Sequence, residues 1–245
     1  MNWFQRTPLI ALVLLVAWPG ISYSFNKVEI SKLEYQALPP MCANAGHLLL
    51  QPGIERRSPP LPEGQGQLIW DVGGWHYCNG LVKLRRAELA PRTIETMAIV
   101  KDAIRDMDYS LSRINPKEPW AAEMLVAMAR AWRILEKPDE AKKFLDIARK
   151  NHPSYPQTYL AMATLHFDKA EYTEAVSILK EGVAATEIPS AELEYFLGLA
   201  HFKDGNIEAA RQQERRARSM GYPLTGLARK LTLHDKSPAR DGANP

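Results

Sequence analysis

Two cysteines and two histidines near the start of the chain could bind a metal or form a redox pair. Cys42 and Cys78 are the only cysteines, and His47 and His76 lie five residues after the first and two residues before the second. Two cysteines with two histidines are a common zinc ligand set, but these spacings match no standard zinc finger. In an exported protein an even pair is most simply a disulfide. We therefore predict a Cys42–Cys78 disulfide, with a metal- or redox-linked site as the alternative.

The chain lacks the pattern of a catalytic nucleophile. Cys78 and His76 are two residues apart, and side chains at that separation on a helix do not face each other. The sequence contains no Gly-x-Ser-x-Gly motif of the kind that carries a catalytic serine. We expect a non-enzymatic protein with no catalytic residues, no metal and no cofactor.

The first 24 residues have the features of a secretory signal peptide. Arg6 is their only charged residue, and the apolar run from Pro8 to Trp18 is short for a membrane-spanning helix. Small residues at Ser22 and Ser24 fit a cleavage site after Ser24. We predict that residues 1–24 are removed on export and that no transmembrane span remains; an uncleaved N-terminal anchor is the alternative.

Composition limits the class of protein and of partner. The 245 residues are 46% hydrophobic and 24% charged, which is enough apolar material for a sizeable globular core. The formal net charge is only +3, without the clustered basic face that nucleic-acid binding requires. We expect no nucleic-acid partner.

Residues 25–73 predict an irregular arm. Pro39-Pro40, Pro52-Gly53 and Pro59-Pro60 interrupt any regular element there. A disordered linker is the alternative, but Trp70 and the cysteine at position 42 are features that anchor a segment to a core. We interpret the segment as an arm packed on the helices that follow.

A repeating alanine defines the second half of the chain. Ala141, Ala175 and Ala210 are 34 and 35 residues apart, and each closes a similar short phrase, such as Pro138-Asp-Glu-Ala141. A period near 34 is typical of a helix-turn-helix repeat that stacks into a solenoid. We predict a degenerate helical hairpin over 74–116, three repeats over 120–223, a capping helix over 224–233 and a disordered tail over 234–245.

This pattern resembles the tetratricopeptide repeat (TPR) family. Small residues recur at three positions of each repeat, where paired helices must approach closely: Ala129, Ala163 and Gly198; Ala141, Ala175 and Ala210; Ala148, Gly182 and Ala217. The third repeat departs from the pattern at Glu194 and Glu214, which predicts looser packing or a wetter face. Pro39-Pro-Met-Cys42 before His76-Tyr-Cys78 is similar to exported bacterial TPR proteins. The resemblance implies an all-α solenoid of stacked antiparallel helix hairpins, a bacterial periplasmic location and protein binding.

In a TPR superhelix the first helix of each pair lines a concave groove, which implies a site here. Arginines can clamp a carboxylate and aromatic rings can bury apolar side chains. We predict that the groove binds a peptide or a partner helix, as an adaptor or scaffold of a secretion or polysaccharide-export assembly. Packing against a neighbouring helix or the arm is an equal alternative, and the arm itself could fill the groove. The predicted groove residues are Glu123, Val126, Arg130, Arg133, Gln157, Leu160, Thr164, Phe167, Glu192, Tyr195, Leu199 and Phe202.

Two further sets of residues have simple structural explanations. His166 and His201 share one repeat position with Trp132, so we interpret them as satisfied residues between helices. The basic run on the second helix of the third repeat is typical of a solvated face; a glycan- or lipid-binding helical module is the alternative, and self-association of the solenoid stays open. The run consists of Arg211, Arg215, Arg216 and Arg218.

Overall fold

The computed structural model of the chain describes residues 28–44 and 71–236. The predicted signal peptide, His47 and the end of the predicted tail lie outside these residues. Helices are the only regular elements in the described ranges. They are α1 (Lys32–Ala37), a 3₁₀ turn η1 (Pro40–Asn44), α4 (Gly74–Leu89), α5 (Ile94–Leu111), α6 (Ala121–Ile134), α7 (Pro138–Asn151), α8 (Pro156–Asp168), α9 (Tyr172–Ala185), α10 (Ala191–Lys203), α11 (Ile207–Ser219) and α12 (Gly226–Lys236).

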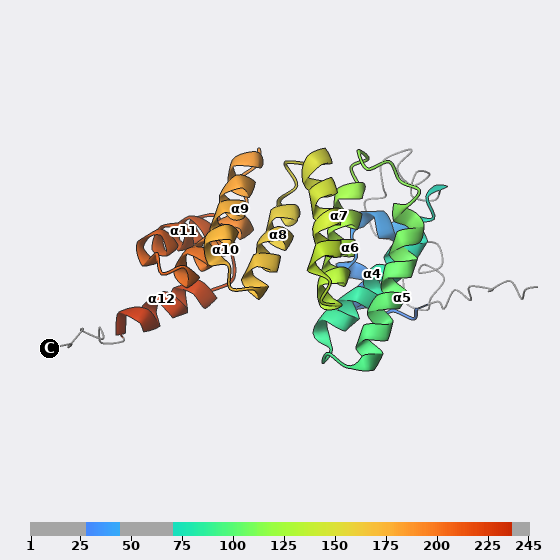
Figure 1. Cartoon of the computed structure of the whole chain (residues 1–245), viewed down its shortest axis with the longest axis horizontal. Helices are drawn as coiled ribbons and strands as arrows, with labels where there is room; N and C mark the ends of the chain where they lie inside the picture. The colour runs from blue at the N-terminus through green and yellow to red at the C-terminus, as the bar shows by residue number, and fades with distance from the viewer. Residues whose placement is uncertain (1–27, 45–70, 237–245) are drawn as a thin grey trace, which may run out of the picture.

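The helices pack as successive hairpins that stack along the long axis of the molecule (Figure 1). The pairs are α4 with α5, α6 with α7, α8 with α9, and α10 with α11. The first helices of the pairs also contact one another in series, α4 to α6, α6 to α8 and α8 to α10, and so form one layer. This arrangement confirms the predicted all-α solenoid. Among the described residues, no helix combines the length and apolar character needed to cross a membrane.

The first helix of each of the three repeats ends in the same way. One residue turns to a positive φ, and the next amide donates a hydrogen bond to the carbonyl five residues earlier, which is the closure of a Schellman motif. The backbone conformation at the end of the first helix therefore recurs with the same period, near 34 residues, as the small side chains. The positive-φ residues are Glu136 (57°), Ala170 (58°) and Gly205 (85°), and the hydrogen bonds are Lys137 to Trp132 at 3.0 Å, and Glu171 to His166 and Asn206 to His201 at 2.9 Å.

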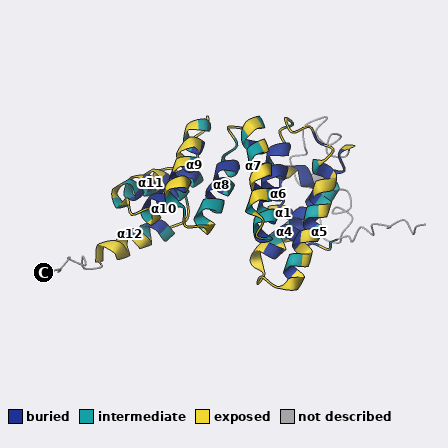
Figure 2. Ribbon diagram, in the orientation of Figure 1, coloured by how far each residue is buried: buried dark blue, intermediate teal, exposed yellow. Residues whose placement is uncertain are grey.

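The recurring small residues lie where the paired helices touch. The alanines of the ladder, Ala141, Ala175 and Ala210, are fully buried. A Cβ on Gly182 would lie 2.7 Å from the Cβ of Tyr159 on the partner helix, and one on Gly198 would lie 3.0 Å from the Cβ of Gln213. Real Cβ atoms essentially never approach to 2.7 Å, and 3.0 Å is tighter than nine in ten of their contacts, so the helix spacing favours small residues at both positions. Figure 2 shows the resulting stripe of buried residues along each helix.

The first hairpin differs from the repeats in length and in the groups that it buries. The helices α4 and α5 have 16 and 18 residues, against 13 or 14 in α6 to α11. A buried polar network joins the two helices. Lys83 is paired with Asp102 and, at 2.7 Å, with Asp106, and the amide of Asn79 donates to Asp106 at 2.6 Å. Because each buried charge has a partner, the network keeps the two helices in one register.

The described part of the arm packs on α4. A disulfide joins Cys42 in η1 to Cys78 in α4, with 5.6 Å between their Cα atoms, as the sequence predicted. Tyr35, Leu38 and Met41 are buried beside it. The arm is not wholly irregular, which corrects one expectation: α1 forms because Ser31 and Glu34 make a reciprocal capping box.

The C-terminal end of the solenoid is covered by α12. Leu227 and Leu231 are buried against α10 and α11. The helix extends to Lys236, three residues further than the predicted capping helix over 224–233. The predicted tail therefore begins with helical residues, and residues 237–245 lie outside the described part of the chain.

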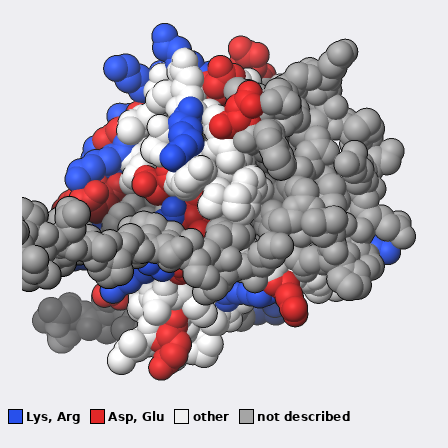
Figure 3. All heavy atoms as spheres, turned by 90° about the vertical axis from the view of Figure 1, so that its right-hand side faces the viewer, with Lys and Arg blue, Asp and Glu red and all other residues white. Residues whose placement is uncertain are grey.

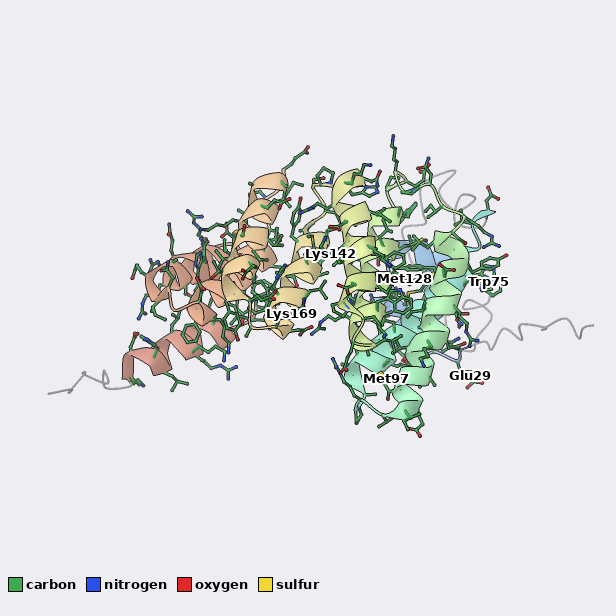
Figure 4. The ribbon with its side chains drawn as sticks, in the orientation of Figure 1. Glu29, Trp75, Met97, Met128, Lys142 and Lys169 are labelled. Carbon is green, nitrogen blue, oxygen red and sulfur yellow. A yellow bond between two sulfur atoms is a disulfide. The ribbon has the colours of Figure 1, made fainter. Side chains whose placement is uncertain are left out.

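Charges of both signs are mixed over the described surface at the α4–α5 end of the molecule (Figure 3). The core lies between the helix layers, and Met128 of α6 is among its fully buried side chains (Figure 4). The buried residues form three neighbouring clusters from the arm to α12, so the core continues along the stack.

Candidate binding groove

A cavity of about 450 Å³ opens in the layer formed by the first helices of the hairpins. Its walls come mainly from α4, α6 and α8, with the first turns of α10 at one end. It lies on the inner layer because α4, α6, α8 and α10 contact one another in series. The lining residues are Tyr77, Leu81, Arg85, Glu88, Glu123, Val126, Ala127, Ala129, Arg130, Arg133, Leu145, Tyr155, Gln157, Leu160, Ala161, Thr164, Leu165, Glu192 and Phe196.

Most of the residues predicted to face the groove gather in this cavity. They come from the same inner-facing positions of successive repeats, as the repeat pattern implied. One hydrogen bond, from the Gln157 amide to Glu192 at 2.8 Å, links α8 to α10 at its end. The predicted residues that line the cavity are Glu123, Val126, Arg130, Arg133, Gln157, Leu160, Thr164 and Glu192.

Four predicted groove residues do not line the cavity. Two of them are covered by α12. The ring of Tyr195 is buried, with its centroid 4.7 Å from that of Tyr222, and its side chain belongs to the cluster that includes Leu227 of α12. Phe202 packs in the same cluster. The helix α12 thus covers the inner face of α10 at this end. Phe167 packs beside Tyr172, 6.0 Å between ring centroids, and Leu199 also lies away from the cavity.

The two arginines predicted to clamp a ligand carboxylate already hold carboxylates of this chain. The Arg130 guanidinium donates to both oxygens of Glu88, at 2.9 and 2.6 Å. Arg133 donates to both oxygens of Asp168, at 2.5 and 2.7 Å. A bidentate pair uses the fork geometry that would otherwise grip a ligand. Both arginines therefore join inner helices, α6 to α4 and α6 to α8.

A glutamate and two tyrosines make the most unusual electrostatic environment in the cavity. Burial raises the pKa of Glu123, although Arg85, Arg130 and the nearby Tyr77 hydroxyl act in the opposite direction. Burial also raises the pKa of Tyr155 to about 12, with the Glu123 carboxylate as the second cause. Tyr77 is fully buried, and its hydroxyl has no partner in hydrogen-bond geometry among the described residues. The hydroxyl lies close enough to Glu123 to lower the carboxyl pKa without meeting that geometry.

One wall of the cavity was absent from the sequence prediction. It belongs to α4, whose residues Tyr77, Leu81, Arg85 and Glu88 recur every three or four positions on one face. The prediction treated the first hairpin as degenerate and assigned it no inner face. The spacing of these residues was the available signal, since α4 occupies the same place in the layer as the first helix of a repeat.

Comparisons with known proteins name no family for the chain. No family model matches it, and no curated protein matches it. Among solved structures, a MamA RS-1 ArsTM double mutant matches with 18% identity and a TM-score of 0.45, over 63% of this chain and 86% of the other. TTC0263, a thermophilic TPR protein of Thermus thermophilus, matches with 16% identity and a TM-score of 0.46, over 69% of this chain and 97% of the other.

The fold is TPR-like. The chain's own hairpins show this likeness, whereas the two solved structures resemble the chain only weakly. The helix pairs recur every 34 or 35 residues, keep small residues at their contacts and close their first helices identically.

The metal alternative has no support in the described residues. Both cysteine sulfurs are joined in the disulfide, so neither is a thiolate ligand, and His47 lies outside the described part. No cluster of three or more potential ligands occurs in the described ranges. His76 stacks between Trp75 and Tyr109, with ring centroids 3.7 and 4.0 Å away. Burial lowers its pKa.

The basic run of α11 is neutralised within the chain. Each arginine has a carboxylate within salt-bridge distance, which agrees with a solvated face and reduces the charge offered to a glycan or an anionic lipid. The partners are Asp235 for Arg211, Glu208 for Arg215, Glu194 for Arg216 and Glu214 for Arg218.

We expected both His166 and His201 to have hydrogen-bond partners between the helices, and among the described residues only His166 has one at its Nδ1 atom. Nδ1 of His166 lies 2.8 Å from the carboxylate of Glu171. His201 is buried, and its Nδ1 has no hydrogen-bond partner among the described residues. Burial lowers the pKa of His201, with Lys180 as a further cause. Neither histidine lines the cavity.

Proposed function

We propose that this chain is a non-enzymatic adaptor or scaffold that holds a segment of another protein in the cavity of its inner layer. The observation that carries the proposal is the cavity itself, which combines apolar residues such as Val126 and Leu160 with charged and polar side chains. A concave site of about this volume, with apolar contacts and converging polar groups, is a typical binding site. Stacked helical repeats also present extended inner surfaces suited to a long ligand.

An extended segment suits this cavity better than a helix. A helix satisfies its own backbone hydrogen bonds, whereas an extended chain needs donors and acceptors from its receptor. The cavity offers such groups in the Tyr155 hydroxyl and in the side chains of Gln157 and Thr164. None of the lining residues comes from residues 28–44, so the described part of the arm leaves the cavity open.

We further propose that the protein acts in an exported compartment, within an envelope assembly for secretion or polysaccharide export. The Cys42–Cys78 disulfide supports export, because disulfides persist in oxidising compartments and are rare in the cytosol. N-terminal sequencing of the protein from its host tests the location. A mature chain that begins at Phe25 supports it, and a chain that begins at Met1 in the cytosolic fraction contradicts it.

The binding proposal is tested by placing a bulky charge inside the cavity. Thr164 is a half-buried cavity residue, and Thr164→Arg would block the site; Ile147→Arg on α7 is the matched control on an exposed position outside the cavity. Proteins crosslinked to the chain in its host are quantified for the wild type and both variants. A partner lost only in Thr164→Arg, with the helical circular-dichroism signal unchanged, supports the function; equal recovery in both variants contradicts it.

A further inference from the structure

The cavity contains a buried polar pair that the fold itself leaves incomplete. Tyr77 has no exposed surface, and its hydroxyl lies close enough to the Glu123 carboxyl to act on it as a donor. The carboxyl itself has no cation within salt-bridge distance in the described ranges. Both residues line the cavity, so a cationic ligand there can pair with the Glu123 carboxyl.

The positive charges of the cavity are already used. Arg130 and Arg133 hold Glu88 and Asp168 in bidentate pairs. Arg85 donates to the backbone carbonyl of Ala37, and so ties the arm to α4. Each guanidinium group therefore has an acceptor from within the chain, whereas in the described ranges no cation lies within salt-bridge distance of the Glu123 carboxyl, and Arg85 and Arg130 act on it only from further away.

The charged groups in and beside the cavity leave an excess of one negative charge. Three arginines and three glutamates line the cavity, and Asp168, which pairs with Arg133 from outside the lining, adds a fourth carboxylate. A second acidic group, Glu192, accepts a hydrogen bond from the neutral amide of Gln157, which is not a cation. An anionic ligand would meet this excess and would have to displace two bidentate pairs, whereas a cationic ligand would displace none.

We propose that the cavity binds a positively charged residue, a lysine or arginine of the bound protein segment, with Glu123 as its counter-ion. This inference rests on the proposed function and names the chemistry that the same site recognises. The ligand cation donates to the Glu123 carboxylate from the cavity, and the buried Tyr77 hydroxyl donates its proton to the same carboxylate. Apolar neighbours such as Val126 and Leu160 contact the methylene groups of the ligand side chain.

The burial of Glu123 makes such recognition selective. Because burial raises its pKa, the ionised carboxylate is costly in the empty cavity. A cation removes that cost, whereas a neutral residue of the same length leaves it in place. The site therefore distinguishes lysine or arginine from an apolar residue through the charge alone.

A random peptide library displayed on phage tests the proposal before any natural partner is identified. The library is selected on the oxidised full-length mature chain, and an enriched peptide is then titrated against wild type, Glu123→Gln and the control Glu174→Gln, an exposed carboxylate in the first turn of α9. We expect every enriched peptide to contain lysine or arginine. Its affinity falls at least about tenfold with Glu123→Gln and is unchanged with Glu174→Gln. Replacing the cationic residue of the peptide by norleucine gives the same loss, and the two changes together cost no more than either alone.

The remaining outcomes separate the two proposals. Enriched peptides that Thr164→Arg blocks, but that lack a cationic residue or ignore Glu123→Gln, overturn the cation proposal and leave the binding function standing. A selection that enriches no peptide, or only peptides that Thr164→Arg does not block, overturns both. Far-UV circular dichroism is the control for folding. Glu123→Gln hardly changes the size of the side chain, so its helical signal should equal that of wild type, and any fall in affinity then comes from the lost charge.

Discussion

Arg130 of α6 holds both carboxylate oxygens of Glu88 of α4, at 2.9 and 2.6 Å, across the edge of the cavity. The pair connects the first hairpin to the first repeat and fixes the width of the groove at that point. It also removes from ligand binding an arginine that the repeat pattern alone assigned to a carboxylate clamp. The two side chains retain 40% and 26% of their exposure, so the pair has the modest strength of a partly solvated ion pair.

A double-mutant cycle on this pair tests whether Arg130 is structural. We expect Arg130→Met and Glu88→Gln each to lower the free energy of unfolding by about 0.5–1 kcal/mol, and the double variant to lose little more than either single one. Urea unfolding followed by circular dichroism measures all four proteins. Strictly additive losses would mean that the pair does not form in solution, and would return Arg130 to the role of a ligand clamp.

The disulfide should supply a large share of the stability of the arm and α4. It closes a loop over a sequence separation of 36 residues, for which the chain-entropy model gives at most about 4 kcal/mol. We expect the variant with both Cys42→Ala and Cys78→Ala to lose about 2–4 kcal/mol of unfolding free energy. Wild type in excess reductant should reproduce that loss. Two reactive thiols in the untreated native protein would contradict the bond.

The repeats were accessible to sequence analysis because their signals are local and periodic. Small residues at Ala141, Ala175 and Ala210 fix where helices touch, and that spacing sets the phase of each inner face. The cover that α12 places over Tyr195 and Phe202 is a tertiary contact between distant segments, which no period encodes.

The electrostatic state of the site was likewise hidden from the sequence. Arg130 and Arg133 have the right residue type and position for a clamp, and only the folded chain brings Glu88 and Asp168 to them. From the sequence alone, Glu123 looks like an ordinary surface charge. Only the folded chain shows that it is buried beside Tyr77. Pairing and burial depend on the meeting of residues that are distant in sequence, so they escape a local pattern.

The shared turn of the repeats predicts opposite effects for two opposite substitutions. Ala170 adopts a φ of 58° and Gly205 a φ of 85° at the same repeat position, and a built Cβ on Gly205 meets no atom within 4 Å. A residue with a Cβ pays about 1 kcal/mol in this conformation. We expect Ala170→Gly to raise the unfolding free energy and Gly205→Ala to lower it, each by roughly 0.5–1 kcal/mol. Thermal and urea unfolding measure both; shifts in the same direction would contradict a common turn.

Acid should loosen the arm from α4. Glu34 accepts hydrogen bonds from Arg86 at 2.6 and 3.0 Å, and this pairing is the main reason that its pKa is lowered from 4.5 to about 2. A depressed carboxyl pKa contributes stability that is present above pH 4.5 and is lost as the pH falls toward 2. We expect the acid-induced fall in unfolding free energy over that range to be smaller in Glu34→Gln than in wild type. Glu187→Gln, an exposed carboxylate between α9 and α10, serves as the control and should behave as wild type does.

The central claim is that the inner layer of the solenoid holds a segment of another protein. Site-specific photocrosslinking in the living host tests it most directly, with a photoreactive residue at Thr164 in the cavity and, in a second strain, at the exposed Ile147 outside it. We predict a covalent adduct from position 164 whose crosslinked peptide maps to one segment of one partner protein, and no such adduct from position 147. Absence of an adduct at 164, or the same adducts from both positions, would contradict the account.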